Sequence, residues 1–199
     1  DRHSVGQILE TVSVLLLLSH SAIVELDRKG VPHPRLLRGL RILDSLGLSA
    51  LRGQALDVDL EKRRDVSIGE SVNVAQLKSA SLTSCATELG AALGIDDVAE
   101  ISLYAQLGWH LGLLMQLMND IAAVWPGGPD KSDLRLHKKT LPVVFALNLS
   151  GPSSRYARVV RTYYESDASG VQTDEVKWAL WRCGAIHYTW LVAGREKAE

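Results

Sequence analysis

The chain has 199 residues, of which 46% are hydrophobic and 23% are charged, and its formal net charge is -1. This composition is typical of a globular protein with one sizeable core. It disfavours nucleic acid or an anionic membrane as a partner, because the sequence has no basic arm and no block of like charges. Cys85 and Cys183 are far apart and lack metal-binding spacing, so we expect reduced thiols in a cytoplasmic protein.

The most hydrophobic stretch covers residues 12–24. It is too short to span a bilayer, and Ser19, His20 and Ser21 interrupt it. Because no basic region or small-residue cleavage site precedes it, a secretory signal peptide is not expected either. We therefore expect this stretch to be a buried core helix and expect no membrane span.

Helical periodicity dominates the rest of the chain, and the alternating patterns typical of strands are nearly absent. Ser67 followed three residues later by Glu70 has the form of a capping box at a helix N-terminus. Pro142 falls in the first turn of a predicted helix, where proline is tolerated. One all-α domain is therefore predicted, with helices at about 4–28, 35–63, 67–94, 97–125 and 141–149, and two or three more in a tail interrupted at 166–170.

A triplet of polar side chains lies in the middle of an apolar helical run. Gln116, Asn119 and Asp120 are spaced i, i+3 and i+4, so they share one face of the helix. Leu113 and Leu117 point in other directions. Such a triplet faces either water or something polar inside the protein.

Further polar side chains stand in two other predicted helices and in the segment after the turn-rich loop 126–133. Gln54 and Asp57 share a helix face, and Lys78 lies among small and aliphatic residues. Carboxylate and amide oxygens suit Mg²⁺, and lysines suit a diphosphate. Taken singly, each group could equally have a structural role, as a solvated helix end or a snorkelling lysine. The segment after the loop contributes Asp133, Arg135, Lys138, Lys139 and Thr140.

Four motifs, in this order, resemble the trans-isoprenyl diphosphate synthases, also called polyprenyl synthetases. They are GQALDVDLE (53–61), LKSASL (77–82), LGLLMQLMNDIAAVW (111–125) and SDLRLHKKTLPVVFAL (132–147). The late CGAIHY (183–188) resembles that family's C-terminal helix. The resemblance implies an all-α helical bundle of the isoprenoid-synthase type around a central cavity. In that cavity Mg²⁺ ions would bind an allylic prenyl diphosphate.

The resemblance also implies roles for five residues. Asn119 and Asp120 occupy the first two places of the second aspartate-rich motif, so both are expected to bind metal. Lys78 and Lys138 match lysines that bind diphosphate. Gln116, one turn before the motif, is expected to contact diphosphate as well. Asp120, Lys78 and Gln116 would be the catalytic residues.

The chain also departs from the family pattern. The first aspartate-rich motif and the arginines that follow it are absent, so we expect N-terminal helices to be missing from this sequence. An asparagine, Asn119, replaces the first aspartate of the second motif, and Ala123 stands where a third carboxylate can occur. An amide coordinates metal without contributing charge, so the metal affinity of this helix should be reduced. Ser79 replaces the usual threonine.

Two functions are consistent with these features. The first is a class I isoprenoid synthase that ionises an allylic diphosphate with Mg²⁺. Ionisation would be followed by prenyl transfer to isopentenyl diphosphate or by cyclisation, as in terpene synthases. The second is a non-catalytic regulatory subunit, a degenerate paralogue of a prenyl diphosphate synthase. A homodimer is expected in the first case and a hetero-oligomer in the second, and a helical interaction module with structural polar groups is a third alternative.

Overall fold

The structure is a computed structural model that describes residues 5–128, 132–150, 154–165 and 170–196. Within these ranges every regular secondary-structure element is a helix, which confirms the predicted all-α class. Two short segments, η1 (Leu26–Lys29) and η2 (Gln76–Ala80), are a 3-10 helix and a π-helix. The α-helices are α1 (Val5–Glu25), α2 (His33–Lys62), α3 (Ile68–Ala75), α4 (Ser81–Gly94), α5 (Val98–Val124), α6 (Ser132–Arg135), α7 (Leu141–Asn148), α8 (Ser154–Glu165), α9 (Thr173–Arg182) and α10 (Ala185–Glu196).

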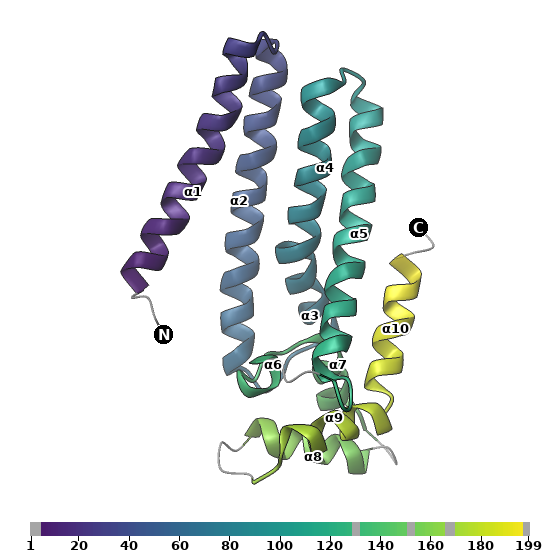
Figure 1. The fold of residues 1–199 in the computed structure, drawn as a ribbon. Helices are drawn as coiled ribbons and strands as arrows, with labels where there is room; N and C mark the ends of the chain where they lie inside the picture. The colour runs from purple at the N-terminus through teal and green to yellow at the C-terminus, as the bar shows by residue number, and fades with distance from the viewer. Residues whose placement is uncertain (1–4, 129–131, 151–153, 166–169, 197–199) are drawn as a thin grey trace.

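The long helices α1, α2, α4 and α5 run lengthwise through the molecule, and α8 and α9 cross beneath them (Figure 1). Helix α4 packs against both α2 and α5, whereas α10 packs against the second half of α5 and against α7. Leu113 and Leu117 of α5 are fully buried in this packing. The C-terminal halves of α2 and α5 therefore lie in one region with α3, α6 and α7.

Helix ends follow the sequence signals closely. Gly30 stops η1 with a left-handed φ of 80°, and the Asp97 side chain caps α5. Ser67 and Glu70 form the predicted capping box, in which the Ser67 hydroxyl accepts from the backbone N–H of Glu70. Pro142 lies in the first turn of α7, as expected. The predicted break at 166–170 falls mostly outside the described residues.

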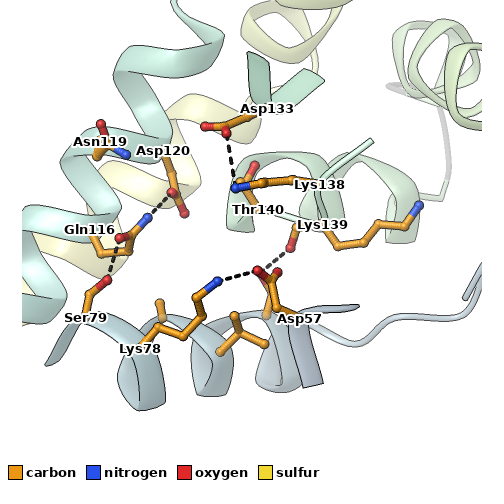
Figure 2. Close-up of a pocket in the computed structure, with 13 residues that line it drawn as sticks. Asp57, Lys78, Ser79, Gln116, Asn119, Asp120, Asp133, Lys138, Lys139 and Thr140 are labelled. Carbon is orange, nitrogen blue, oxygen red and sulfur yellow. Dashed lines mark hydrogen bonds and ion pairs between the residues drawn. The ribbon is translucent and has the colours of Figure 1, made fainter. Parts of the chain in front are cut away.

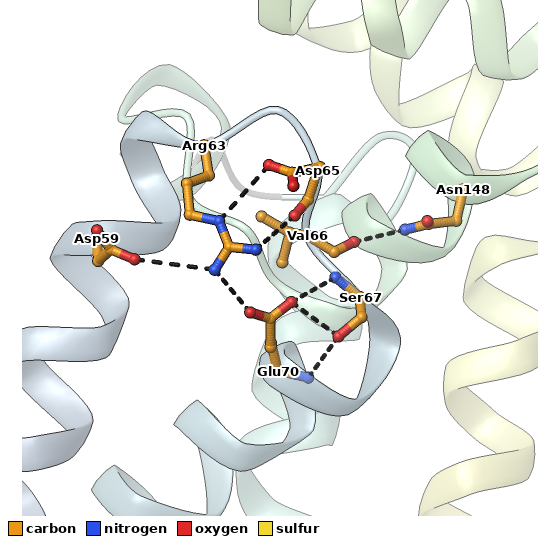
Figure 3. A network of polar contacts seen from close by, with 7 residues as sticks. All are labelled: Asp59, Arg63, Asp65, Val66, Ser67, Glu70 and Asn148. Atoms are coloured by element: carbon orange, nitrogen blue, oxygen red, sulfur yellow. Dashed lines mark hydrogen bonds and ion pairs between the residues drawn. The ribbon is translucent and has the colours of Figure 1, made fainter.

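A polar network fixes the turn between α2 and α3 (Figure 3). The Arg63 guanidinium donates to the Glu70 carboxylate at 2.6 Å and to the Asp65 carbonyl at 2.8 Å. Hydrogen bonds from the backbone N–H and hydroxyl of Ser67, together with Arg63, lower the pKa of Glu70 to about 2. Asn148 of α7 donates to the Val66 carbonyl at 2.7 Å. The network thereby ties α2, α3 and α7 together below the bundle.

Two glycines allow close contact on either side of η2. A Cβ on Gly53 of α2 would lie 2.8 Å from the Cγ of Lys78, and a Cβ on Gly112 of α5 would lie 2.8 Å from the Ser79 carbonyl oxygen. Both helices therefore approach the backbone of η2 more closely than a larger residue would permit. The sequence predicts one continuous helix over 67–94, and the structure divides it at this π-helical turn.

Helix α1 differs from expectation in its burial. We expected residues 12–24 to form a buried core helix, but in the described structure only Ile23 of this stretch is buried, with 5% of its side chain exposed. Leu15, Leu17 and Leu18 are each more than half exposed. The prediction is wrong because α1 packs against α2 along one side only (Figure 1). None of the helices in the described ranges combines the length and apolarity needed to cross a membrane.

Candidate active site

A polar pocket of about 210 Å³ lies between the C-terminal halves of α2 and α5 (Figure 2). Helices α3, α6 and the link from α6 to α7 close its remaining sides. The structure brings all five predicted site residues to its wall: Lys78, Gln116, Asn119, Asp120 and Lys138. Its other lining residues are Asp57, Ser71, Val74, Ala75, Ser79, Asp133, Lys139 and Thr140.

On the α5 side, a chain of hydrogen bonds orders the polar triplet. The Ser79 hydroxyl donates to Gln116 Oε1 at 2.6 Å, and Gln116 Nε2 donates to Asp120 Oδ1 at 2.7 Å. Because Ser79 donates to the amide oxygen, the amide nitrogen of Gln116 is directed at Asp120. Ser79 therefore fixes the orientation of Gln116, a contact that the sequence did not reveal.

Asp120 is the most buried charged group of this wall, with 4% of its side chain exposed. Burial raises its pKa to about 7, and the nearby charge of Asp133 acts in the same direction. The Gln116 amide, the backbone N–H of Leu141 and the charge of Lys138 oppose this rise. Asn119, one residue earlier, is exposed at the pocket wall. The helix thus presents one buried carboxyl and one accessible amide to the pocket.

On the opposite wall, Lys78 forms an ion pair with Asp57. Their Nζ and Oδ2 atoms are 2.5 Å apart, and both side chains are partly buried. Gly53, one helical turn before Asp57, permits α2 to lie against η2, so this pair forms across the two helices. Gln54, which we grouped with Asp57 in the sequence, is exposed and does not line the pocket.

The third wall is the segment from α6 to α7. Lys138 lies 3.5 Å from the Asp133 carboxylate, and both face the pocket (Figure 2). The side chain of Lys139 runs away from this pair, and burial lowers its pKa. Sequence reasoning noted Asp133 beside Lys138 without assigning it to the site. Ser71 was missed because its partner, the Lys139 carbonyl at 2.9 Å, is 68 residues away in sequence.

The donor atoms of the pocket fit a hard divalent cation. They are carboxylate and amide oxygens, and neither histidine nor cysteine lines the pocket. Across the described ranges, no group of three or more His, Cys, Asp or Glu side chains could hold a metal ion unaided. Mg²⁺ is commonly bound by one or two carboxylates together with waters and substrate phosphates. Asp120 and Asn119 are suited to that partial role, with lysines nearby for an anionic ligand.

A sequence model of the family described as polyprenyl synthetase matches residues 4–180 of this chain. The (2E,6E)-farnesyl diphosphate synthase of Mycobacterium tuberculosis is 32% identical over 146 residues, or 71% of this chain and 39% of that protein. The geranylgeranyl diphosphate synthase of the same organism is 33% identical over 143 residues, or 69% of this chain and 40% of that protein. The chain therefore spans about 40% of the length of these relatives.

Among solved structures, a polyprenyl synthetase from Streptomyces coelicolor has a TM-score of 0.84 and 28% sequence identity with this chain. The match covers 98% of this chain and 59% of that one. The whole described bundle therefore has a counterpart in a polyprenyl synthetase. This likeness confirms the expected isoprenoid-synthase-type fold.

Proposed function

Since the chain belongs to the polyprenyl synthetase family, we propose that it acts as a Mg²⁺-dependent prenyl diphosphate synthase. Its substrates would be an allylic prenyl diphosphate and isopentenyl diphosphate. The observation that carries this proposal is the polar pocket, in which Asp120 and Gln116 on one wall face Lys78 and Lys138 on the others. Farnesyl and geranylgeranyl diphosphate synthases among the relatives favour prenyl transfer over cyclisation.

Each residue of the pocket would have a distinct task. Lys78 and Lys138 would neutralise the diphosphate of the allylic substrate, both before and after its bond to carbon breaks. Their present partners, Asp57 and Asp133, keep these ammonium groups at the pocket wall when no anion is bound. Gln116, held by Ser79, would donate to a diphosphate oxygen or orient a water molecule beside Asp120.

Asp120 and Asn119 would hold Mg²⁺, which when bound supplies positive charge that stabilises the departing diphosphate. Asp120 must be ionised to bind the metal. Burial opposes ionisation, because it raises the pKa of this carboxyl to about 7. Binding of the cation would displace the proton of the carboxyl. Because the described residues contain no group of three or more His, Cys, Asp or Glu side chains that could hold a metal ion, the diphosphate and water molecules would supply further ligands.

The proposed function also includes a domain organisation, an oligomeric state and a cellular location. We propose that residues 1–199 form one domain of the synthase, because the polar pocket draws on helices from α2 to α7. A homodimer would cover the exposed apolar residues of α1. A cytoplasmic location is supported by Cys85 and Cys183, which are both free thiols.

The test is a turnover assay with purified protein, isopentenyl diphosphate and geranyl, farnesyl or geranylgeranyl diphosphate. We expect Mg²⁺-dependent diphosphate release and an elongated prenyl diphosphate, detected by mass spectrometry, and no release by Asp120→Ala. Release without isopentenyl diphosphate, giving a cyclic hydrocarbon, would identify a terpene synthase instead. Absence of turnover with every allylic substrate would contradict the proposal and favour a non-catalytic subunit.

A further inference from the structure

One tyrosine of α8, Tyr164, contacts three consecutive residues, of which Lys138 and Lys139 line the polar pocket. The Tyr164 hydroxyl donates to the Lys138 carbonyl at 3.0 Å. The Lys139 ammonium lies 4.5 Å from the centre of the Tyr164 ring, and the His137 ring lies 5.0 Å from it. Tyr164 itself does not line the polar pocket. Its hydrogen bond and ring contacts reach the pocket wall through the segment 137–139.

The same segment is held from its other sides. The Lys138 backbone N–H donates to the Asp133 carbonyl at 3.0 Å, and the Ser71 hydroxyl donates to the Lys139 carbonyl at 2.9 Å. His137 adopts a left-handed conformation with φ of 51°, which is uncommon for a residue other than glycine. Such a conformation persists when the surrounding contacts fix the backbone. Tyr164 and Ser71 supply such contacts at adjacent carbonyls.

These contacts accompany opposite side-chain directions of two neighbouring lysines, Lys138 and Lys139. With its carbonyl held by Tyr164, Lys138 directs its ammonium toward Asp133 and the polar pocket. The Lys139 side chain runs the other way (Figure 2), and its ammonium lies over the face of the Tyr164 ring. Burial raises the pKa of the Tyr164 phenol, so it remains a donor over the physiological pH range. The hydroxyl and the ring thus place the two lysines on opposite sides of one backbone segment.

We propose that Tyr164 is a positioning residue that holds the Lys138 ammonium at the polar pocket and thereby sets the pocket's affinity for diphosphate. The ligand in this inference rests on the proposed function. The anchoring of Lys138 rests on the contacts alone. An experiment can therefore test the two parts separately.

The test is Tyr164→Phe, which removes the hydroxyl and keeps the ring that contacts His137 and Lys139. Tyr156→Phe is the matched control, because Tyr156 lies on the same helix and bonds to Arg155, away from the pocket. Loss of one hydrogen bond should speed amide hydrogen exchange at Lys138 by roughly three- to tenfold in Tyr164→Phe. The affinity for inorganic diphosphate with Mg²⁺, measured by calorimetry, should fall by a similar factor.

A double-mutant cycle separates positioning from general loss of structure. If Tyr164 acts through Lys138, Tyr164→Phe should not weaken diphosphate binding further in a Lys138→Met background. Unchanged exchange at Lys138, or equal diphosphate affinities in Tyr164→Phe and the wild type, would overturn the inference. An additional loss in the Lys138→Met background would also overturn it. A wild type that binds no diphosphate would instead contradict the proposed function, and hydrogen exchange alone would then decide the anchoring.

Discussion

Asp120 carries its carboxyl group on a side chain that is only 4% exposed, and burial raises its pKa to about 7. In the unfolded chain the same group titrates near its ordinary pKa of 3.8. Between these values the folded protein binds more protons than the unfolded chain, so the free energy of unfolding falls as the pH rises. Carboxyl groups whose pKa is strongly raised by burial are common at functional sites, and Asp120 lies at the wall of the polar pocket.

We expect Asp120→Asn to remove this pH dependence. The variant should be more stable than the wild type at pH 8, by roughly 1–3 kcal/mol, because no charge is then buried. Its affinity for inorganic diphosphate with Mg²⁺ should fall at least tenfold, since a negative metal ligand is lost. Urea denaturation at pH 5 and pH 8, with calorimetry at pH 8, measures both effects. Asp59→Asn, at an exposed position of α2, is the control, and equal pH profiles for all three proteins would contradict the assignment.

Lys78 should contribute to ligand binding much more than to stability. Its ion pair with Asp57 is partly exposed, so breaking it should change the free energy of unfolding by only about 1 kcal/mol. A charged hydrogen bond to a diphosphate is stronger, and Lys78→Met should weaken diphosphate binding roughly 10- to 100-fold. Lys62→Met, at the exposed end of α2, controls for the change in net charge. Equal affinities of the two variants would remove Lys78 from the site.

The sequence identified most of the pocket at the level of residues. Helical spacing alone placed Gln116, Asn119 and Asp120 on one face, and the family motifs supplied Lys78 and Lys138. The contacts that orient these side chains could not be predicted. Examples are the hydroxyl of Ser79 on Gln116 and the hydroxyl of Ser71 on the Lys139 carbonyl, which depend on how distant helices pack.

At the level of elements, the π-helical turn η2 has no local sequence signal, and α2 and α5 pack closely against it on both sides. No proline or glycine lies within Gln76–Ala80, so the sequence predicts an uninterrupted helix there. Such π-helical turns recur at functional sites, where they redirect side chains. Here the turn carries Lys78 and Ser79 to the polar pocket. The helix ends, in contrast, were predictable because Ser67 and Gly30 form local caps.

Gly112→Ala tests this close packing. The added Cβ would lie 2.8 Å from the Ser79 carbonyl oxygen and 2.9 Å from the Ala80 Cα, so α5 and η2 must move apart. We expect a loss of about 1–3 kcal/mol in the free energy of unfolding. Gly90→Ala is the matched control, because no atom lies within 4 Å of its added Cβ and alanine favours the helix. Chemical denaturation checks both variants, and equal stability would contradict the packing.

At the level of the whole molecule, the described structure exposes many large apolar side chains. Several of them lie on α1 and α5: Val12, Leu15, Leu17, Leu18, Leu103, Leu107, Leu111 and Met115. Apolar surfaces of this kind usually mark a contact with another protein or another segment. The sequence indicated the apolar character of α1 but not its exposure, because periodicity does not reveal which neighbours are present.

We expect the chain to self-associate through these surfaces. Analytical ultracentrifugation at micromolar concentration should show a dimer or a larger species. Replacing Leu15 and Leu17 of α1 with glutamine should lower the association constant at least tenfold, because two apolar contacts are lost. The exposed Arg41→Gln on α2 is the control. A monomer at all concentrations would contradict the expected homodimer.

In the proposed function, the polar pocket binds a divalent metal together with a diphosphate. Its most direct test is a crystal structure of the protein with Mn²⁺ and inorganic diphosphate, in which anomalous scattering locates the metal. We predict an anomalous peak within coordination distance of an Asp120 oxygen, with diphosphate oxygens contacting Lys78 and Lys138. A peak elsewhere, or diphosphate bound away from these residues, would contradict the claim.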